Sequence, residues 1–416
     1  MTDPRAGKPV VVLKFGGTSV AGPEGRSALC ARVLDAIARG RAPVVVVSAM
    51  GRGGAPYATD TLLRLLDGYE VVPREADLLA STGEIVSAVL VAHRLRAGGV
   101  AAMAMTGGEA GVVTDGVFGD AAIVGVDPAP LDAAVDAGVV PVVAGFQGIG
   151  PGGQVTTLGR GGSDTSACAI GAALRAEAVE IHTDVDGVMT ADPRACDGVR
   201  VLDSLRYEEL FQMARAGAKV VHAPAVELAM DAGVPVWVRN TYSPARGTII
   251  ASAEKLGEGG QHRVATAVTH VDDIVRVRLS TAPGGGERAR TLGLTRVFRE
   301  MADASVSLDM FTPCGPSLLF SFESARLPTV EDALDRVRLP YEIQRGLATV
   351  TLVGAGMHGV PGVMARVAEA LASASVDVLQ IADSHYTITV LVPQSGSRAA
   401  IAALHGEFGL GAIDGA

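Results

Sequence analysis

Short apolar runs alternate with longer amphipathic or apolar segments along the first part of the chain. The runs are rich in valine and bounded by glycine, proline or charged residues, a pattern that predicts buried β-strands separated by helices. Such strands predict a mainly parallel sheet covered by helices on both faces. The predicted strands are Val10–Lys14, Pro43–Ser48, Val100–Met105, Val139–Gly145, Val179–His182 and Pro235–Arg239, and the predicted helices include Arg26–Arg39, Ala76–Arg96, Asp164–Leu174 and Tyr207–Ala216.

The last third of the chain contains an internal repeat. The segment from Arg296 aligns without a gap on the segment from Arg366, 70 residues later, with identical pairs that include Ser305 and Ser375. Each copy is predicted to form a βαββαβ unit. A stretch rich in glycine and charge precedes the repeat and predicts a linker. The predicted domains are 1–252, a linker at 253–263, and two repeat domains at 264–345 and 346–416.

Composition narrows the class of protein. The 416 residues include 48% apolar but only 4% aromatic residues, and 52 glycines, which favours an α/β protein with many tight turns. The formal charge of -10 without a basic cluster argues against a nucleic-acid partner. The four cysteines are widely spaced and the N-terminal residues are polar. These features predict a cytoplasmic protein with reduced thiols and no membrane span.

The most informative chemical motif follows the first predicted strand. Lys14 lies at the strand's C-terminal edge, and Gly16 and Gly17 open a tight turn directly after Phe15. Glycines let backbone N–H groups approach a ligand closely, and lysine adds a full positive charge. The motif therefore suits an anion such as a phosphate group, with a plain turn as the alternative.

Two further segments carry polar residues at strand or helix ends. Residues 156–167 form a Gly-rich loop with Arg160, followed by Ser163 and Asp164 at a predicted helix start. Residues 183–194 follow another strand and are dense in carboxylates, hydroxyls and turn residues. That composition suits the edge of a nucleotide or a metal.

These three segments, in this order, resemble the aspartokinases of the amino acid kinase family. Smaller matches agree: Ser48-Ala49-Met50-Gly51, Ala58-Thr59-Asp60, Gly83-Glu84, Gly145-Phe146-Gln147-Gly148 and Gly217-Ala218-Lys219-Val220-Val221-His222. The repeat resembles the tandem ACT regulatory domains of aspartokinases. The resemblance implies a three-layer sandwich with a mainly parallel central sheet, followed by two βαββαβ ACT-like domains.

The same resemblance implies an activity and its partners. The activity is ATP-dependent phosphorylation of the side-chain carboxylate of L-aspartate, the first step toward lysine, threonine and methionine. Mg²⁺ is expected on the ATP phosphates, and no protein ligand is predicted for it. The implied effector at the ACT-like domains is lysine or threonine, and these domains are expected to form a homodimer or higher homo-oligomer.

Residue roles follow from matching positions. Glu84 can pair with the α-ammonium of an amino acid, and Arg160 can fork onto its α-carboxylate. The expected substrate-binding residues are Ser48, Thr59, Glu84, Arg160, Gly161, Gly162 and Ser163. The expected nucleotide-binding residues are Lys14, Phe15, Gly16, Gly17, Thr183, Asp184, Asp192, Arg194 and Lys219. Lys14, Arg160 and Asp164 are expected to act in phosphoryl transfer, whereas His182 is expected to be a packed core residue.

The chemistry of such a reaction is mainly electrostatic. A carboxylate with a pKa of about 3.9 is already ionised at pH 7, so it needs no general base to attack phosphorus. Cations and N–H donors must bring two anions together, and neither histidine nor cysteine is required. Two alternatives stay open: a kinase for another acidic amino acid such as glutamate, and a non-catalytic amino-acid sensor.

Overall fold

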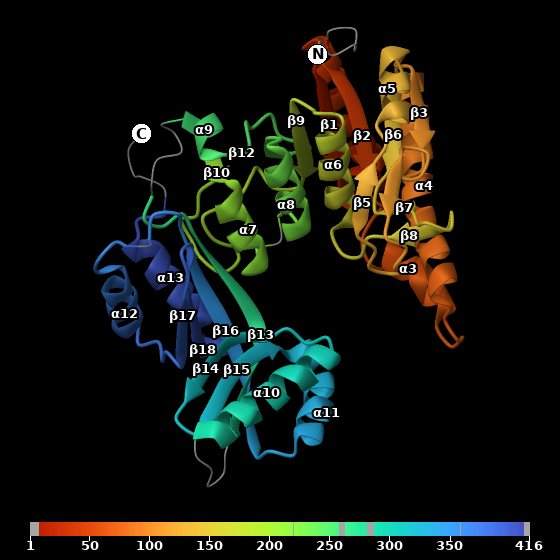
Figure 1. Cartoon of the computed structure of the whole chain (residues 1–416). Coiled ribbons are helices and arrows are strands. Elements are labelled where there is room, and N and C mark those ends of the chain that lie inside the picture. Colours follow the sequence, from red (N-terminus) through yellow and green to blue (C-terminus); the bar gives the residue numbers. More distant parts are fainter. Residues whose placement is uncertain (1–7, 219, 258–262, 281–286, 358, 412–416) are drawn as a thin grey trace. The chain divides into compact units, whose positions relative to one another are not determined.

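The computed structural model describes residues 8–218, 220–257, 263–280, 287–357 and 359–411. These residues form two compact units (Figure 1). The first unit contains residues 8–188, 201–214 and 220–257, and the second contains residues 189–200, 215–218 and those from 263 onward. Two short segments within the predicted domain 1–252 therefore group with the second unit. Residues 253–256 of the predicted linker form a short helix in the first unit.

The first unit is built around a sheet that confirms the predicted parallel pattern. Among the described residues, eight strands pair in the order β10-β12-β11-β9-β1-β2-β6-β3, and only β11 and β12 are antiparallel neighbours. All six predicted strands are present. The strands are β1 (Val10–Phe15), β2 (Ala42–Val47), β3 (Ala102–Met105), β6 (Val140–Ala144), β9 (Ala178–Thr183), β10 (Ser204–Arg206), β11 (Val236–Asn240) and β12 (Thr248–Ala251).

Helices cover both faces of this sheet. Valines and leucines of β1, β2 and β6 form one core with α2 and α4, whereas α6 packs over β1 and β9 on the opposite face. Side chains alternate between the two faces along each strand, so Leu13 and Phe15 face α2 and α4 while Lys14 faces α6. The helices are α1 (Gly17–Ala21), α2 (Pro23–Ala38), α3 (Thr59–Leu63), η1 (Arg64–Leu66), α4 (Pro73–Ala97), α5 (Ala129–Asp136), α6 (Gly162–Ala173), α7 (Tyr207–Arg215), α8 (Ala223–Ala232) and α9 (Ala253–Leu256).

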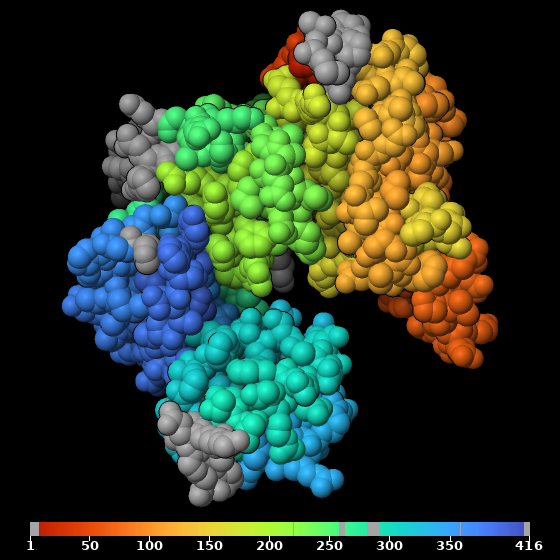
Figure 2. All heavy atoms as spheres, viewed as in Figure 1, coloured from red at the N-terminus to blue at the C-terminus, as the bar shows by residue number. Residues whose placement is uncertain are grey.

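A second, smaller sheet lies beside α4. It joins β5 (Ile123–Val126), β4 (Val112–Thr114), β7 (Gln147–Ile149) and β8 (Val155–Thr157) in that order. In the described part of the chain, α4 alone is long and apolar enough to cross a membrane, but half of its most apolar window is buried in the protein. Core helices of globular proteins often have this length and composition, so these features of α4 are weak evidence for a membrane span. Figure 2 shows α3 and the start of α4 projecting from the first unit.

The second unit contains an antiparallel sheet, and its repeat confirms the 70-residue offset. Among the described residues, the strand order is β14-β15-β13-β16-β18-β17. Ser305 and Ser375 both adopt left-handed backbone, with φ of 53° and 55°. The elements are β13 (Ala267–Ser280), α10 (Glu287–Asp303), β14 (Asp309–Cys314), β15 (Ser317–Glu323), η3 (Ser324–Arg326), α11 (Leu327–Val337), β16 (Tyr341–Val353), α12 (Val363–Ser373), β17 (Gln380–Asp383), β18 (Thr387–Pro393), η4 (Gln394–Gly396) and α13 (Ser397–Glu407).

The two repeat copies share their long strands, which the contiguous boundaries at 264–345 and 346–416 do not anticipate. The second copy ends in α13 and takes its remaining strand from the first half of β13, where Ala267–Val271 pairs with the second half of β16. The register shifts after Val271, and Asp273 has a φ of 58°. Beyond this bulge, β13 contributes to the core of the first copy instead.

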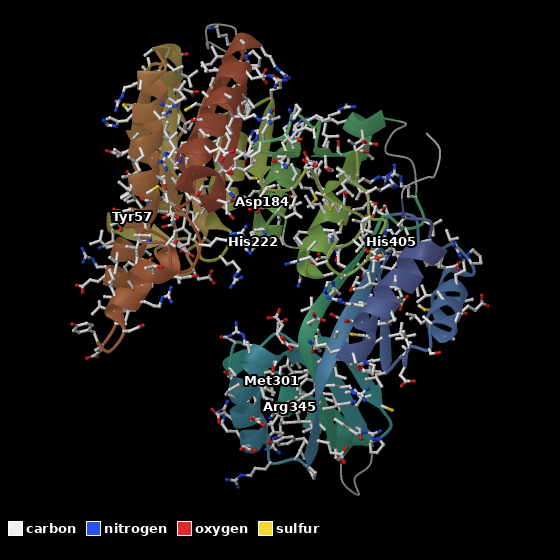
Figure 3. All side chains as sticks on the ribbon, turned by 180° about the vertical axis from the view of Figure 1, so that it is seen from behind. Tyr57, Asp184, His222, Met301, Arg345 and His405 are labelled. Atoms are coloured by element: carbon white, nitrogen blue, oxygen red, sulfur yellow. The ribbon has the colours of Figure 1, made fainter. Side chains whose placement is uncertain are left out.

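The segment 189–200 completes the core of the second copy. Ala191 and Cys196 pack with side chains of α12 and α13. Thr190 is fully buried, and its Oγ1 lies 2.9 Å from Nε2 of His405 on α13 (Figure 3). A segment that leaves the first unit after β9 is thus part of the hydrophobic core of the second.

Candidate active site

A lysine–aspartate ion pair lies at the centre of the first unit's sheet. Lys14 near the end of β1 directs its Nζ to within 2.7 Å of Oδ1 of Asp164, and both side chains are 12% exposed. Asp164 belongs to the first turn of α6, where the helix dipole favours a negative charge. Asp164 therefore holds the Lys14 amine near the carboxyl ends of the parallel strands, where open α/β sheets bind ligands.

The turn after β1 is tightly packed at Gly17. A Cβ on Gly17 would lie 2.6 Å from the carbonyl oxygens of both Ala49 and Gly51, so only glycine fits there. The N–H of Gly51 donates to the carbonyl of Gly17 at 3.0 Å. A Cβ on Gly16 would lie 3.8 Å from Lys14 Nζ. This turn is thus joined to the loop that follows β2, beside the lysine amine.

The Gly-rich loop before α6 also requires glycine. Gly161 caps the helix with a φ of +72°, and a Cβ there would lie 2.3 Å from Cγ of His222. A Cβ on Gly162 would collide with Leu158 and Phe146. Arg160, immediately before these glycines, is exposed and has no hydrogen bond or ion pair within the described ranges. Its guanidinium is free to bind a carboxylate or phosphate.

Glu84 is a buried carboxylate with one unpaired oxygen. It lies on α4 at 2% exposure, and its Oε1 accepts a hydrogen bond from the N–H of Ala49 at 2.9 Å. Its buried Oε2 has no hydrogen-bond partner among the described residues. Burial raises the pKa of Glu84 to about 8, against the lowering effect of the Ala49 N–H. A cation placed beside Oε2 would favour the ionised form.

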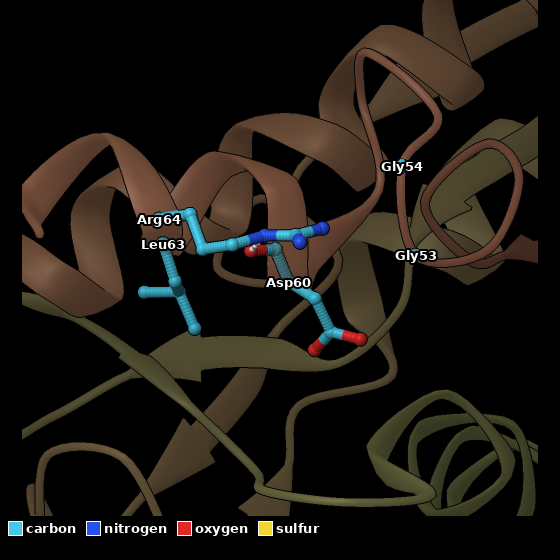
Figure 4. A pocket seen from close by; sticks show the side chains of 5 residues that line it. All are labelled: Gly53, Gly54, Asp60, Leu63 and Arg64. Atoms are coloured by element: carbon cyan, nitrogen blue, oxygen red, sulfur yellow. Dashed lines mark hydrogen bonds between the residues drawn. The ribbon is translucent and has the colours of Figure 1, made fainter.

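Gly83 allows α4 to approach the loop after β2, since a Cβ there would lie 2.7 Å from the carbonyl of Tyr57 and 2.9 Å from Cβ of Ala49. Ser48, half-buried, precedes Ala49, and its N–H donates to the carbonyl of Phe15. Thr59 begins α3. An open hollow beside this helix is lined by Gly53, Gly54, Asp60, Leu63 and Arg64 (Figure 4).

Polar residues at the end of β9 form the other part of the site. Thr183 Oγ1 donates to Oδ1 of Asp184 at 3.2 Å, and Oδ2 of Asp184 accepts from Nη2 of Arg52 at 3.1 Å (Figure 3 labels Asp184). The Arg52–Asp184 pair is exposed, so it is worth less than about 1 kcal/mol and exchanges readily for another partner. Arg52 was not among the predicted residues, although it lies between Gly51 and Gly53.

Two of the predicted nucleotide-binding residues group with the second unit, and a third is not described. Asp192 and Arg194 belong to the second unit, where Arg194 donates to both carboxylate oxygens of Asp192 and lowers the pKa of that carboxyl. Arg194 is exposed. Lys219 lies outside the described residues.

Phe15, one of the predicted nucleotide-binding residues, turns its side chain away from the lysine side of the sheet. Its side chain is fully buried on the face of the sheet opposite Lys14, because alternate residues of a strand point to opposite faces. It stacks on His182 at a ring distance of 4.6 Å. Only the backbone of Phe15 can reach a ligand at the lysine side. His182 is 1% exposed, which confirms its prediction as a core residue.

No group of three or more histidine, cysteine, aspartate or glutamate residues in the described ranges is arranged to hold a metal ion. Lys14 and the start of α6 meet in an ion pair. Glu84 is linked to the turn after β1 through Ala49, whose N–H it binds and whose carbonyl lies beside Gly17. Positive charge, backbone N–H groups and a buried carboxylate in one place suit a substrate that carries both an ammonium group and several negative charges.

Comparison with known proteins gives a consistent result. The sequence model of the amino acid kinase family matches residues 9–240, and that of an ACT domain matches residues 342–406. Aspartokinase 1 of Bacillus subtilis is 42% identical over 405 residues, covering 96% of this chain and 99% of the relative. The aspartokinase of Mycolicibacterium smegmatis is 38% identical and covers 97% of each chain.

Solved structures agree along almost the whole length. Escherichia coli aspartokinase III in complex with aspartate and ADP superposes with a TM-score of 0.79 at 25% identity, covering 96% of this chain and 99% of that one. The same protein in complex with lysine and aspartate gives a TM-score of 0.76 at 25% identity, with equal coverage.

Proposed function

The chain belongs to the aspartokinases of the amino acid kinase family, and on this premise we propose that it transfers the γ-phosphoryl group of ATP to the side-chain carboxylate of L-aspartate. The observation that carries the proposal is the buried carboxylate of Glu84, whose Oε2 has no hydrogen-bond partner in the described part of the chain and whose Oε1 binds Ala49 beside the Gly17 turn. A buried carboxylate is stabilised by a cation, and the α-ammonium of an amino acid supplies one.

In the proposed complex, the two ends of the α-amino acid are held by opposite charges. Glu84 pairs with the α-ammonium, and the free guanidinium of Arg160 binds the α-carboxylate. Ser48, Thr59, Gly161, Gly162 and Ser163 are proposed to complete the substrate pocket. The side-chain carboxylate is then available to meet the γ-phosphate beside Lys14.

The reaction moves a phosphoryl group between two anions. A carboxylate oxygen of aspartate forms a bond to the γ-phosphorus, the bond from that phosphorus to the bridging oxygen breaks, and ADP leaves with the electron pair. No proton transfer is needed because the carboxylate is already ionised. We assign the stabilisation of the transferred group to the Lys14 amine, which Asp164 orients, and to the N–H groups of the Gly16–Gly17 turn.

The nucleotide is proposed to bind at the ends of β1 and β9. Thr183 and Asp184 suit the sugar and phosphate side of ATP, and Asp192, Arg194 and Lys219 remain proposed contacts. We propose that Mg²⁺ enters bound to the ATP phosphates, where it neutralises their charge.

The second unit is proposed to bind an amino-acid effector, lysine or threonine, and to join copies of the chain into a dimer or larger oligomer. A relative of the same fold has been solved with lysine and aspartate, which supports lysine as one candidate. The four cysteines are free, in keeping with our proposal of a cytoplasmic location. The proposed role is the first step of the aspartate-derived amino-acid pathway.

A coupled ADP-release assay tests the reaction. Aspartate, glutamate and N-acetylglutamate are compared at saturating MgATP, and the acyl phosphate is trapped with hydroxylamine as a hydroxamate. We expect aspartate-dependent ADP release with an equal yield of aspartyl hydroxamate, lowered by added lysine or threonine. Turnover with glutamate but not with aspartate would support the proposed class of reaction and contradict aspartate as the substrate. ADP release with none of these acids would favour a non-catalytic sensor.

A further inference from the structure

Helix α4 carries a second buried carboxylate that the proposed reaction does not use. Asp77 is 3% exposed and lies seven residues before Glu84, which is about two helical turns. The two acidic side chains therefore lie on similar sides of the same helix. Oε2 of Glu84 has no hydrogen-bond partner within the described ranges, whereas both oxygens of Asp77 accept hydrogen bonds from the protein itself.

Asp77 binds the end of β8 and the loop that connects β4 to β5. Its Oδ2 accepts hydrogen bonds from the N–H of Thr157 at 2.7 Å and from the N–H of Gly119 at 3.0 Å. Its Oδ1 accepts from the hydroxyl of Thr157 at 2.8 Å. Thr157 thus donates both its backbone and its side-chain hydrogen to one carboxylate, which fixes the end of β8 on α4.

The residue held in this way leads directly into the arginine loop. Thr157 is the last residue of β8, and Arg160 follows three residues later. The carbonyl of Thr157 accepts from the N–H of Ala121 at 2.9 Å, and the N–H of Leu158 donates to the carbonyl of Phe146 at 2.9 Å. Arg160 itself is exposed and forms no bond with the described residues. Its place is therefore set by the backbone on either side of it.

We propose that Asp77 is a positioning residue for substrate recognition, which sets through Thr157 the point at which Arg160 meets the α-carboxylate. This inference rests on the proposed function. One rigid helix then determines both ends of the bound amino acid, since Glu84 binds the ammonium directly and Asp77 holds the loop that binds the carboxylate. Fixing the spacing of two recognition groups before binding lowers the entropy that binding loses.

The chain offers a matched control in the same strand. Thr156 precedes Thr157, and its Oγ1 lies 2.6 Å from Oγ1 of Thr114. The side chains of Thr156 and Thr114 are both buried, and among the residues that the structure describes neither hydroxyl bonds to Asp77. Thr156→Val and Thr157→Val therefore each remove one buried hydroxyl from β8, but only the second removes a bond to the carboxylate.

The test measures KM for aspartate, KM for ATP and kcat of the full-length protein. Asp77→Asn is expected to raise KM for aspartate by about tenfold, because small displacements of a positioning group cost large factors in binding. KM for ATP should change by less than about twofold. Thr157→Val should also raise KM for aspartate. Thr157→Ser, which keeps the hydroxyl, should have a KM for aspartate near that of the unmodified protein, and so should Thr156→Val. Equal effects of the two valine substitutions would overturn the proposal.

A double substitution tests whether Asp77 acts through Arg160. In an Arg160→Ala background, Asp77→Asn should raise KM for aspartate no further, because the group that it positions is absent. If Asp77→Asn raises KM for aspartate in that background as much as it does in the unmodified protein, Asp77 supports the fold in general and does not act through Arg160.

Hydrogen exchange of the substrate-free protein gives a readout that does not depend on activity. Asp77→Asn should accelerate exchange in peptides that cover residues 117–121 and 155–161, with exchange elsewhere unchanged. If the protein lacks aspartate-dependent turnover, the proposed function is wrong. The exchange experiment still tests whether Asp77 holds the segments that contain Gly119 and Thr157. Unchanged exchange in both peptides would refute the positioning role.

Discussion

Replacement of Glu84 by glutamine is expected to abolish the pH dependence of aspartate binding between pH 6 and pH 8. In the ligand-free protein, burial raises the pKa of Glu84 to about 8 from an ordinary value near 4.5. In the proposed complex, the ammonium of the substrate pairs with the ionised carboxylate, so binding below pH 8 would release a proton from Glu84. The affinity for aspartate should therefore rise with pH over this interval.

The magnitude follows from the ionised fraction of Glu84. With a pKa of about 8, that fraction is about one in a hundred at pH 6, one in ten at pH 7 and one half at pH 8. If only the ionised form binds, KM for aspartate should fall by roughly 50-fold from pH 6 to pH 8. At pH 7, ionising the side chain costs about 1.4 kcal/mol of the binding energy.

The same pKa predicts how stability depends on pH. The folded, ligand-free state binds the Glu84 proton more tightly than the unfolded state does, so the group's contribution is fully present below pH 4.5 and is lost as the pH rises toward 8. Glu84→Gln has no such proton. Its free energy of unfolding should decline less between pH 6 and pH 8.5 than that of the unmodified protein.

The assay is ADP release at saturating MgATP with aspartate varied at each pH. Glu84→Gln should have a KM for aspartate that is high and nearly constant from pH 6 to pH 8, with KM for ATP unchanged. Glu75→Gln, an exposed position on the same helix, is the control and should retain the original profile. A Glu84→Gln variant that keeps the original pH profile would refute the ammonium-binding role.

Three other substitutions test the proposed catalytic role of Lys14 and the core of the second unit. Lys14→Met should lower kcat by about a hundredfold or more, because it removes a cation from the transferred group. It also leaves Asp164 without its partner, so adding Asp164→Asn should restore thermal stability but not turnover, and near-normal turnover in either variant would contradict the role of Lys14. Burial and the charge of Arg200 lower the pKa of His405, so the unfolded state gains protons first and stability should fall as the pH drops below about 6.5. His405→Gln can keep the bond to Thr190 and should lose less stability than the unmodified protein between pH 7 and pH 5 in urea unfolding; an equal loss would exclude His405 as the cause.

The sequence predicts the first unit's sheet well because its strands are nearly uninterrupted apolar runs. Val10–Leu13 and Val44–Val47 are buried on both faces, so local composition and tertiary environment agree. The repeat was equally visible, since residues such as Ser305 and Ser375 are identical and adopt the same left-handed backbone. The glycine at position 17 of the Lys14 motif has a clear structural reason, because a Cβ there would lie 2.6 Å from the carbonyl oxygens of Ala49 and Gly51.

Features that depend on packing between residues far apart in the chain could not be predicted from the sequence. The burial of Phe15 could have been deduced from strand alternation, since Lys14 and Phe15 cannot face the same side. Arg52 gave only the weak signal of a cation between glycines, and its pairing with Asp184 joins residues 132 positions apart. Neither could the sequence reveal that the oxygens of Asp77 and Glu84 differ in their hydrogen-bond partners, because those partners come from distant strands and loops.

The sequence does not show that the segment 189–200 belongs to the second unit, because the residues on either side of it belong to the first. The N–H of Leu202 donates to the carbonyl of Val188 at 2.8 Å, so the points where the chain leaves and re-enters the first unit are tied together. Between them, Thr190 is bonded to His405 in the second unit's core. Val188 follows Asp184 by four residues. A change in that core therefore has a short covalent path to the proposed nucleotide site, and an effector that favours one core arrangement can alter nucleotide affinity only by its differential binding to the two arrangements.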